Sequence, residues 1–261
     1  MLRTVKVARL FFSHVASISR LTVQTLYWTF VAPFYRKAYS YREVAFQMNR
    51  VGVQSFAIIS LVTMLIGVIL VLQTAYIAEP YGQLDAVPGG VAVSLTREIG
   101  PLLVAVVITG RVGAAYAAEL GAQAVSDEIM ALHCMGINPI GFLIAPRFLA
   151  LLVMLPVLTV YGNFMGMAGG YLIGTLHYGI DPGVYIQSTF DMMKNKDIFS
   201  GALKSFVFAA IVCMVGCYKG FTVTGGSTGV GKSTMEAVVS CIVLIIAADA
   251  IFTALTIFYW P

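Results

Sequence analysis

Residues Phe148–Leu176 read FLALLVMLPVLTVYGNFMGMAGGYLIGTL and form a run of 29 residues without a charged side chain. An α-helix needs about 20 consecutive apolar residues to cross the hydrocarbon core of a bilayer. This run exceeds that minimum, so it predicts a membrane-spanning helix that can tilt or extend past the bilayer.

Four further apolar runs predict the same structure, although three of them contain ionisable residues. The five predicted spans are Val51–Gln73, Val91–Gly113, Phe148–Leu176, Ile198–Tyr218 and Glu236–Trp260. The composition agrees, since 59% of the 261 residues are hydrophobic and 11% are charged, whereas soluble domains have about 45–50% and about 25%. With a mean hydropathy of +0.88, the chain is predicted to be an all-α integral membrane protein. A cytosolic globule, a disordered protein and a secreted disulfide scaffold are excluded.

The distribution of basic residues predicts the orientation. Against one acid, the first 50 residues hold eight basic side chains: Arg3, Lys6, Arg9, Arg20, Arg36, Lys37, Arg42 and Arg50. Four more fall on the same side, for a total of twelve: Arg111, Arg147, Lys219 and Lys232. The opposite loops hold two, Lys194 and Lys196. By the positive-inside rule the N-terminus is cytoplasmic and the C-terminus lies outside, and the basic arm marks a membrane side instead of a nucleic-acid partner.

Residues 1–50 are therefore predicted to form a basic cytoplasmic arm, and residues 51–261 a membrane domain of five spans. Within the arm, Leu10–Tyr35 is apolar and aromatic but contains His14 and Arg20. This pattern favours an amphipathic helix on the inner membrane surface over a sixth span. The membrane domain shows no internal repeat, which argues against the inverted-repeat architecture of many secondary transporters.

The sequence GSTGVGKS at Gly226–Ser233 matches the P-loop pattern GxxxxGK[ST]. Downstream, Ile242–Asp249 resembles the apolar strand of nucleotide-binding proteins that ends in a magnesium-binding aspartate. A P-loop must connect a buried strand to a helix, so that backbone N–H groups surround the phosphates. Here the motif connects two apolar spans, and the imitated strand is part of a span. We therefore expect a glycine-rich cytoplasmic turn, and no nucleotide cofactor in this chain.

Ionisable residues inside the spans are candidates for a polar site: Arg97, Glu98, Lys204 and Asp249. Each costs about 2.5–3.5 kcal/mol near the membrane centre, so each should face protein or water. They can line an outward-opening cavity, or they can form structural ion pairs between helices. The depth of Asp249 favours pairing. Because adjacent helical residues point about 100° apart, we expect Glu98 to face the cavity and Arg97 to pack against neighbouring protein or lipid head groups.

Other chemical sites find little support. The four cysteines form no CxxC pair and have no histidines at ligand spacing, so no metal site is predicted. An intramembrane aspartyl protease would need a second aspartate within the spans besides Asp249. A serine enzyme would need a histidine placed as its base, and the three histidines lie outside the spans. An integral-membrane enzyme and a membrane scaffold protein remain as alternatives to a transport subunit.

Glycines spaced by four form a smooth groove along the helix predicted at Phe148–Leu176: Gly162, Gly166, Gly170 and Gly174. Such a groove allows the close approach of another helix, either within the chain or from a second copy.

Several linked motifs fill the region from the second to the third span. They are Arg97-Glu-Ile-Gly-Pro101, Thr109-Gly-Arg-Val-Gly113, Ala118-Glu-Leu-Gly121, Met135-Gly-Ile-Asn-Pro139 and Ala145-Pro-Arg-Phe-Leu-Ala150. With them the chain resembles the MlaE-type permease family, the membrane subunits of ABC systems that transport lipid together with MCE-domain proteins. The resemblance extends from about Val51 to the C-terminus. Departures are Lys232-Ser233, where the family usually has Arg-Ala, and Asn138, where Asp is common.

The resemblance implies a permease subunit of the bacterial inner membrane with a periplasmic C-terminus, which works as a homodimer on separate ABC ATPase subunits. ATP and Mg²⁺ would be bound by those partners, and the chain itself would not be an enzyme. The other implied partners are an MCE-domain periplasmic protein, a small STAS-type cytoplasmic subunit and membrane phospholipid. The implied function is movement of phospholipid between the inner membrane and the MCE-domain carrier, which maintains outer-membrane lipid asymmetry.

Residues Glu119–Gly136 are predicted to form the short cytoplasmic coupling helix that contacts the ATPase. Their acidic and apolar positions are typical of an amphipathic helix that inserts into a partner's groove, although a helix lying against the spans would show the same pattern. The coupling candidates are Glu119, Asp127, Glu128, Leu132 and Met135.

Overall fold

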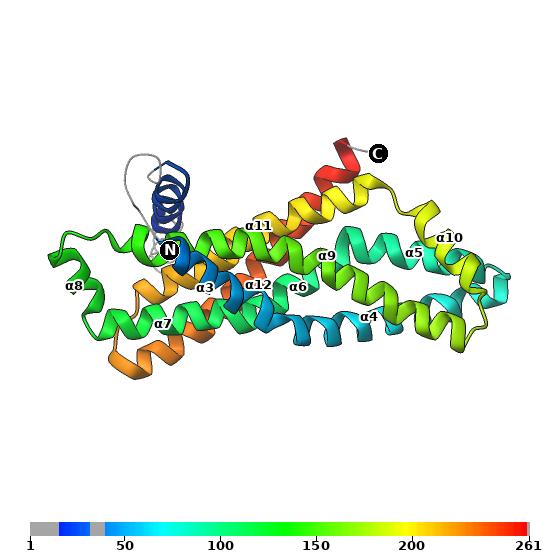
Figure 1. The fold of residues 1–261 in the computed structure, drawn as a ribbon, viewed down its shortest axis with the longest axis horizontal. Helices are drawn as coiled ribbons and strands as arrows, with labels where there is room; N and C mark the ends of the chain where they lie inside the picture. Colours follow the sequence, from blue (N-terminus) through cyan, green and yellow to red (C-terminus); the bar gives the residue numbers. More distant parts are fainter. Residues whose placement is uncertain (1–15, 32–39, 260–261) are drawn as a thin grey trace, which may run out of the picture. The chain divides into compact units, whose positions relative to one another are not determined.

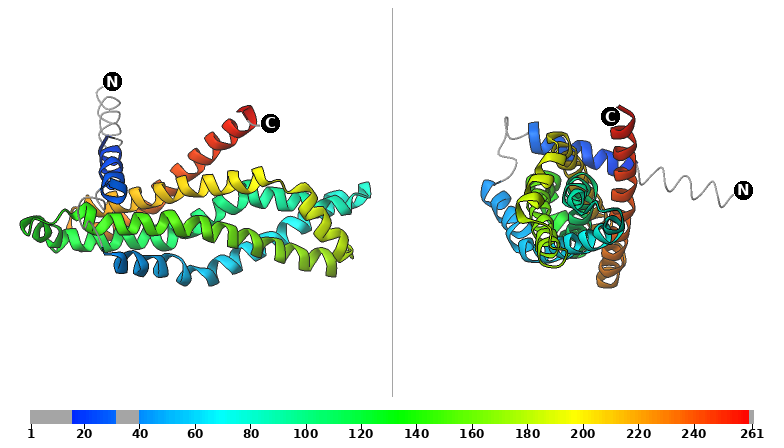
Figure 2. Two further views of the ribbon diagram at one scale, coloured as in Figure 1. Left: turned by 45° about the horizontal axis from the view of Figure 1, so that its top comes forward. Right: turned by 90° about the vertical axis from the view of Figure 1, so that its right-hand side faces the viewer.

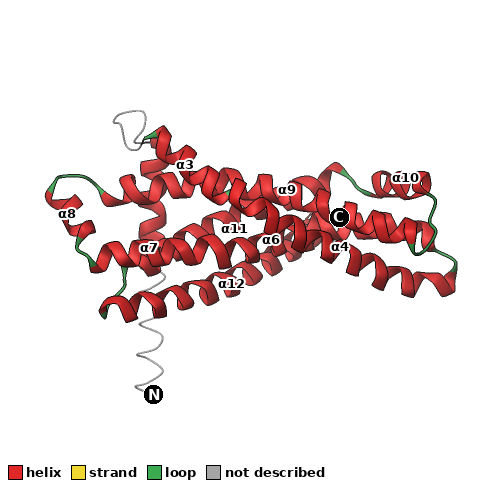
Figure 3. Ribbon diagram, turned by 60° about the horizontal axis from the view of Figure 1, so that its bottom comes forward, coloured by secondary structure: helices red, strands yellow, loops and turns green. Residues whose placement is uncertain are grey.

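The computed structural model describes residues 16–31 and 40–259. Throughout these residues the regular structure is helical, and loops join the helices (Figure 3). Five helical segments of the described chain are long and apolar enough to cross a membrane: Tyr41–Tyr81, Leu84–Val125, Ile140–Leu176, Asn195–Phe221 and Gly226–Thr256. Each overlaps one of the predicted spans. The prediction of an all-α membrane protein with five spans is confirmed.

The second span is an α-helix interrupted twice by π-helical turns. Its order is α5 (Val87–Ser94), η5 (Leu95–Ile99), α6 (Gly100–Ile108), η6 (Thr109–Gly113) and α7 (Ala114–Val125). A π-helical turn bonds residue i to i+5 and often marks a functional site. Both interruptions coincide with motifs of the sequence, and η5 contains the two adjacent charged residues of this span.

The first span comprises α3 (Tyr41–Val51) and α4 (Phe56–Ala78), joined by the 3₁₀ turn η2 (Val53–Ser55). Two more 3₁₀ turns, η3 (Glu79–Tyr81) and η4 (Leu84–Ala86), lead from α4 into α5. The later elements are α8 (Glu128–Cys134), η7 (Ile140–Ile144), α9 (Ala145–Leu176), α10 (Pro182–Met192), α11 (Asn195–Phe221) and α12 (Gly226–Tyr259).

The predicted interfacial helix is described in part. Residues 16–26 are α-helical and continue as the π-helical turn η1 (Tyr27–Val31). This helix exposes Val23, Leu26 and Phe30, as an interfacial helix requires. The remainder of the predicted range lies outside the described residues, as do five residues of the basic arm: Arg3, Lys6, Arg9, Arg36 and Lys37.

The chain packs into two compact units. The first unit comprises Met1–Asn49, Thr109–Leu152 and Ala210–Val243, and the second comprises Arg50–Ile108, Val153–Ala209 and Leu244–Pro261.

In the second unit the predicted glycine groove packs against helices of the same chain. A Cβ atom on Gly67 of α4 would overlap the carbonyl oxygen of Gly166 on α9. A Cβ atom on Gly162 would lie 3.1 Å from Thr63 of α4, and one on Gly174 would lie 2.6 Å from the ring of Tyr185. Small residues permit this backbone approach between helices. Of the two interpretations, the structure supports packing within the subunit.

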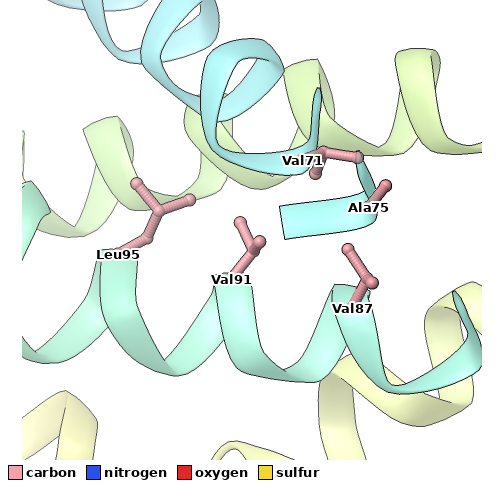
Figure 4. Packing of buried hydrophobic residues seen from close by; sticks show 5 residues of the cluster. All are labelled: Val71, Ala75, Val87, Val91 and Leu95. Atoms are coloured by element: carbon pink, nitrogen blue, oxygen red, sulfur yellow. The ribbon is translucent and has the colours of Figure 1, made fainter. Parts of the chain in front are cut away.

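The second unit has a hydrophobic cluster of its own where α4 meets α5. Val71 and Ala75 of α4 pack with Val87 and Val91 of α5, and Leu95 of η5 completes the cluster (Figure 4). These five side chains are at most 4% exposed. The cluster holds the start of the second span against the end of the first.

Helix α10 packs along α5 (Figure 1), and it was not predicted from the sequence. Asp181 caps its N-terminus, where Oδ1 accepts hydrogen bonds from the N–H groups of Gly183 at 2.8 Å and Val184 at 3.1 Å. Burial raises the pKa of Tyr185 on this helix to about 12. The last turns of α12, drawn in red, extend away from the other helices of this unit (Figure 2).

The first unit uses glycine contacts as well. A Cβ atom on Gly216 of α11 would lie 3.0 Å from the carbonyl oxygen of Gly113 in η6, and one on Gly220 would lie 3.0 Å from that of Ala117 in α7. Lys219 of α11 then pairs with Glu236 of α12 at 2.7 Å. These contacts join α7, α11 and the first half of α12.

We predict that Gly67→Ala lowers the free energy of unfolding by about 1–3 kcal/mol, because the new methyl group must push α4 away from α9. The measurement is thermal unfolding of the purified chain in one detergent. Gly90→Ala is the matched control, since Gly90 lies in a helix and a Cβ atom there meets no atom within 4 Å. Equal melting temperatures for the two variants would contradict the assigned contact.

Candidate functional site

A lysine buried in the second unit is surrounded by three polar side chains. Lys204 of α11 has 1% of its side chain exposed. Its Nζ forms an ion pair with Glu98 Oε2 of η5 and a second one with Asp249 Oδ1 of α12, at 2.8 Å. It also donates a hydrogen bond to Thr253 Oγ1 at 2.9 Å. Thr253 in turn donates to Glu98 Oε2 at 3.0 Å, which closes a network across three elements.

The helices approach closely enough for this network because of a glycine. Gly201 precedes Lys204 by three residues on α11, so both lie on one face of the helix. A Cβ atom on Gly201 would overlap the carbonyl oxygen of Thr96 and lie 3.2 Å from Pro101. The backbone of α11 therefore touches the second span beside Glu98. On α12, Asp249 and Thr253 are four residues apart and share a face.

The cluster carries one positive and two negative formal charges. Its carboxylates differ in access, since 32% of the Glu98 side chain is exposed and 15% of that of Asp249. An ammonium ion this deeply buried requires such partners, because an isolated charge in an apolar environment is strongly unfavourable. The excess negative charge and the exposed edge of Glu98 suit an additional hydrogen-bond donor or cationic group.

Three of the four predicted intramembrane residues thus meet in one place, and the fourth does not. Arg97 is half-buried and takes part in none of the ion pairs recorded for the described residues. Ion pairing between helices, one of the two interpretations of these charges, is observed. Thr253 was missed, and its only signal was the four-residue spacing from Asp249. The role of the four residues in a lipid cavity stays a prediction.

The coupling candidates do not form one helix. Glu119 belongs to α7, which ends at Val125, and Asp127 adopts a left-handed conformation with φ 59° before α8 begins. None of the residues of α8 is buried, and Met130 and Met135 are 63% and 64% exposed. Asp127 and Glu128 are exposed, and Leu132 is half-buried. This segment is therefore an exposed short helix, whereas Glu119 is engaged elsewhere.

Glu119 pairs with Arg147 of the first unit, an arginine from the motif Ala145–Ala150. Arg147 of α9 donates from Nη2 to Glu119 Oε2 at 3.2 Å and from Nη1 to the carbonyl oxygen of Leu143 at 2.9 Å. Its guanidinium carbon lies 5.5 Å from the ring centroid of Tyr116, a cation–π distance. The pair holds the start of α9 against α7.

The residues that match the P-loop pattern, Gly226–Ser233, are helical in the structure. Gly225 and Gly226 have φ of 92° and 68°, and α12 begins at Gly226, so the turn occupies residues 222–225 and the prediction of a turn at Gly226–Ser233 is wrong. Ser233 Oγ donates to the carbonyl oxygen of Lys219 at 2.6 Å, and Lys232 is exposed. Asp249 belongs to the same helix and not to a strand. The motif therefore lacks the strand–loop–helix geometry that surrounds phosphate.

Groups that could hold a metal ion are absent from the described residues, where no three histidine, cysteine or acidic side chains gather. Cys213, Cys217 and Cys241 are buried free thiols, and Cys134 is exposed. The Sγ atoms of Cys213 and Cys217 lie 3.9 Å apart on one helix face.

Comparisons with known proteins agree with the motifs. The family model described as permease MlaE matches residues 44–255. A probable ABC transporter permease protein of Synechocystis sp. is 40% identical over 78% of this chain and 77% of its own. The intermembrane phospholipid transport system permease protein MlaE of Haemophilus influenzae is 33% identical over 80% of each chain. The chloroplastic protein TRIGALACTOSYLDIACYLGLYCEROL 1 of Arabidopsis thaliana is 35% identical over 82% of this chain and 61% of its own.

We predict that Lys204→Met lowers the free energy of unfolding by about 3–5 kcal/mol, because it leaves two carboxylates without their cation. Adding Glu98→Gln and Asp249→Asn to this variant should recover most of the loss. The measurement is unfolding by titration with a denaturing detergent.

Lys219→Met is the control for this prediction. The ion pair of Lys219 with Glu236 has side chains that are 24% and 47% exposed, so its loss should cost less than about 1 kcal/mol. The assigned network would be wrong if the triple variant were no more stable than Lys204→Met alone.

Proposed function

The chain belongs to the MlaE permease family, and from this membership we propose that it moves phospholipid across or out of the membrane in an ATP-driven system. Its relatives are named as permeases, so the chain is a multi-pass transport subunit and not an enzyme. The relative from Haemophilus influenzae is named for intermembrane phospholipid transport. That name and the polar cluster within the spans are what support phospholipid as the substrate.

The substrate site in this proposal is an outward-opening cavity bordered by Glu98. A phospholipid has a polar head and two apolar chains, so its site needs a polar group within an apolar wall. Glu98 offers a carboxylate that is 32% exposed on a span with few polar residues. Lys204 and Thr253 hold that carboxylate in position. Arg97, the residue before it in η5, supplies a positive charge for a head-group phosphate.

The driving force in this proposal comes from partner subunits. ATP and Mg²⁺ are bound by a separate ABC ATPase and not by this chain, in which the residues that match the P-loop pattern are helical. Helix α8 docks on the ATPase in this proposal, because none of its residues is buried, it carries exposed Glu128 and Met130, and exposed Met135 follows it directly. The further partners are an MCE-domain periplasmic protein and a small STAS-type subunit, and the system maintains outer-membrane lipid asymmetry.

The working unit in this proposal is a homodimer in the bacterial inner membrane, with a cytoplasmic N-terminus and a periplasmic C-terminus. Support for a second copy comes from α12. Of its most apolar stretch of 18 residues, 11% is buried, whereas the corresponding share is 28–67% for the other spans. Val239, Val243 and Ile246 are more than half exposed on this helix. A second copy that covers α12 would enclose the cavity between the two chains.

We predict that a photo-crosslinking amino acid at position 98 captures phospholipid in membranes, whereas one at position 206 labels lipid at bulk background. Phe206 is the control because it is 43% exposed on the fourth span. In the reconstituted transporter, Glu98→Ala should lower ATP-driven lipid movement about tenfold, as expected for the loss of one charge-assisted hydrogen bond. Crosslinks from position 98 to protein alone, with transport intact in Glu98→Ala and Glu98→Gln, would refute the cavity.

We predict that Met135→Asp, or Asp127→Lys combined with Glu128→Lys, lowers recovery of the ATPase with the purified chain about tenfold, because interface contacts of this kind concentrate in few residues. The permease itself should keep its melting temperature. Glu79→Lys, an exposed acid in η3, is the matched charge reversal and should leave recovery unchanged. A complex that survives with full activity in the α8 variants would show that α8 does not couple to the ATPase.

A further inference from the structure

A polar cavity of about 310 Å³ lies in the first unit, where α3, α7 and the start of α9 meet. It is lined by Ser40, Glu43, Gln123, Phe142, Leu143 and Arg147. It shares no residue with the Lys204 network, and the motifs used for family recognition include one of its residues, Arg147.

Two of the residues that line this cavity, Arg147 and Gln123, each have a buried polar atom without a hydrogen-bond partner within the described chain. Arg147 uses both terminal nitrogens, but its Nε–H donates to no atom. Gln123 Oε1 accepts no hydrogen bond. Buried polar groups in native proteins are nearly always paired. A ligand that offers an acceptor to Arg147 and a donor to Gln123 would satisfy both atoms.

The charges of the cavity favour a ligand that itself carries both signs. Arg147 attracts an anionic group, and its ion pair with Glu119 at 3.2 Å leaves the guanidinium partly neutralised. Glu43 is an exposed carboxylate whose Oε1 accepts a hydrogen bond from Gln47 at 3.0 Å. A single anion would be repelled by Glu43, and a single cation by Arg147. A zwitterion with phosphate near Arg147 and ammonium near Glu43 matches both.

The surroundings of the cavity are those of a membrane interface. Trp28 packs against Gly141, where a Cβ atom would lie 2.7 Å from the indole ring, and Trp and Tyr gather at the head-group level of membranes. Phe142 is 50% exposed and Phe46 of α3 is 58% exposed. The uncharged part of the third span begins directly after Arg147. Apolar surface for acyl chains thus adjoins a polar cavity for a head group.

We propose that this cavity binds the head group of a phospholipid whose ammonium is primary, with the phosphate at Arg147 and the ammonium at Glu43 and Gln123. A primary ammonium donates hydrogen bonds to these acceptors, whereas the trimethylated ammonium of phosphatidylcholine donates none. The site is a second lipid site, and it does not depend on whether the Lys204 network handles transported lipid.

The test places p-benzoylphenylalanine at position 142 of the full chain in vesicles with equal parts of phosphatidylethanolamine, phosphatidylcholine and phosphatidylglycerol. Mass spectrometry identifies the lipid that is captured. We expect phosphatidylethanolamine to exceed each other lipid about fivefold, the most that a partly exposed charge pair supplies. Glu43→Gln should reduce capture to the proportions in the vesicle. Glu79→Gln, which removes an exposed acid elsewhere, should leave the preference intact.

A second variant and a soluble probe complete the test. Gln123→Leu removes the unpaired amide without changing α3 and should also abolish the preference, so the result does not depend on the folding of one variant. Capture in vesicle proportions by the unaltered cavity would overturn the proposal. So would saturable binding of free phosphoethanolamine to the detergent-purified chain without lipid capture at position 142, because the ligand would then be a soluble phosphate ester.

Discussion

An ammonium ion in an apolar environment persists only beside carboxylates, and Lys204 imposes this requirement on the second unit. Its partners, Glu98 and Asp249, lie about 100 residues before it and 45 residues after it in the chain, so η5, α11 and α12 must meet at one level. The requirement also fixes the register of α11, because a shift by one residue would turn the ammonium away from both acids. A single buried charge therefore specifies how three elements are arranged.

Glycine supplies the close approach that such a network needs. Gly201 brings the backbone of α11 against Thr96 beside Glu98, and Gly67 brings α4 against Gly166 of α9. In the first unit Gly216 meets Gly113 in the same way. Lipid chains are as apolar as leucine side chains, so helices in a membrane gain stability from close packing more than from removal of apolar surface from water. Both units follow this rule.

The spans were predictable because a largely apolar run of this length rarely forms any structure other than a membrane-spanning helix. The need of Asp249 for a partner followed from its depth in the fifth span. Which residues pair could not be predicted, since it depends on contacts between distant segments. The break between α7 and α8 at Asp127 also carried no strong signal, because aspartate tolerates a left-handed conformation without requiring it. The turn expected at Gly226–Ser233 was misplaced because Gly225 and Gly226 suffice to reverse the chain, and the later glycines of the motif are accommodated in α12.

The two π-helical turns of the second span affect how positions along it are compared. Each turn bonds residue i to i+5 where an α-helix bonds i to i+4. A helical wheel drawn with a constant step of about 100° per residue thus loses phase at η5 and again at η6. Periodicities measured by cysteine scanning or spin labelling on α5 and α7 will be offset from each other, although both helices belong to one continuous span.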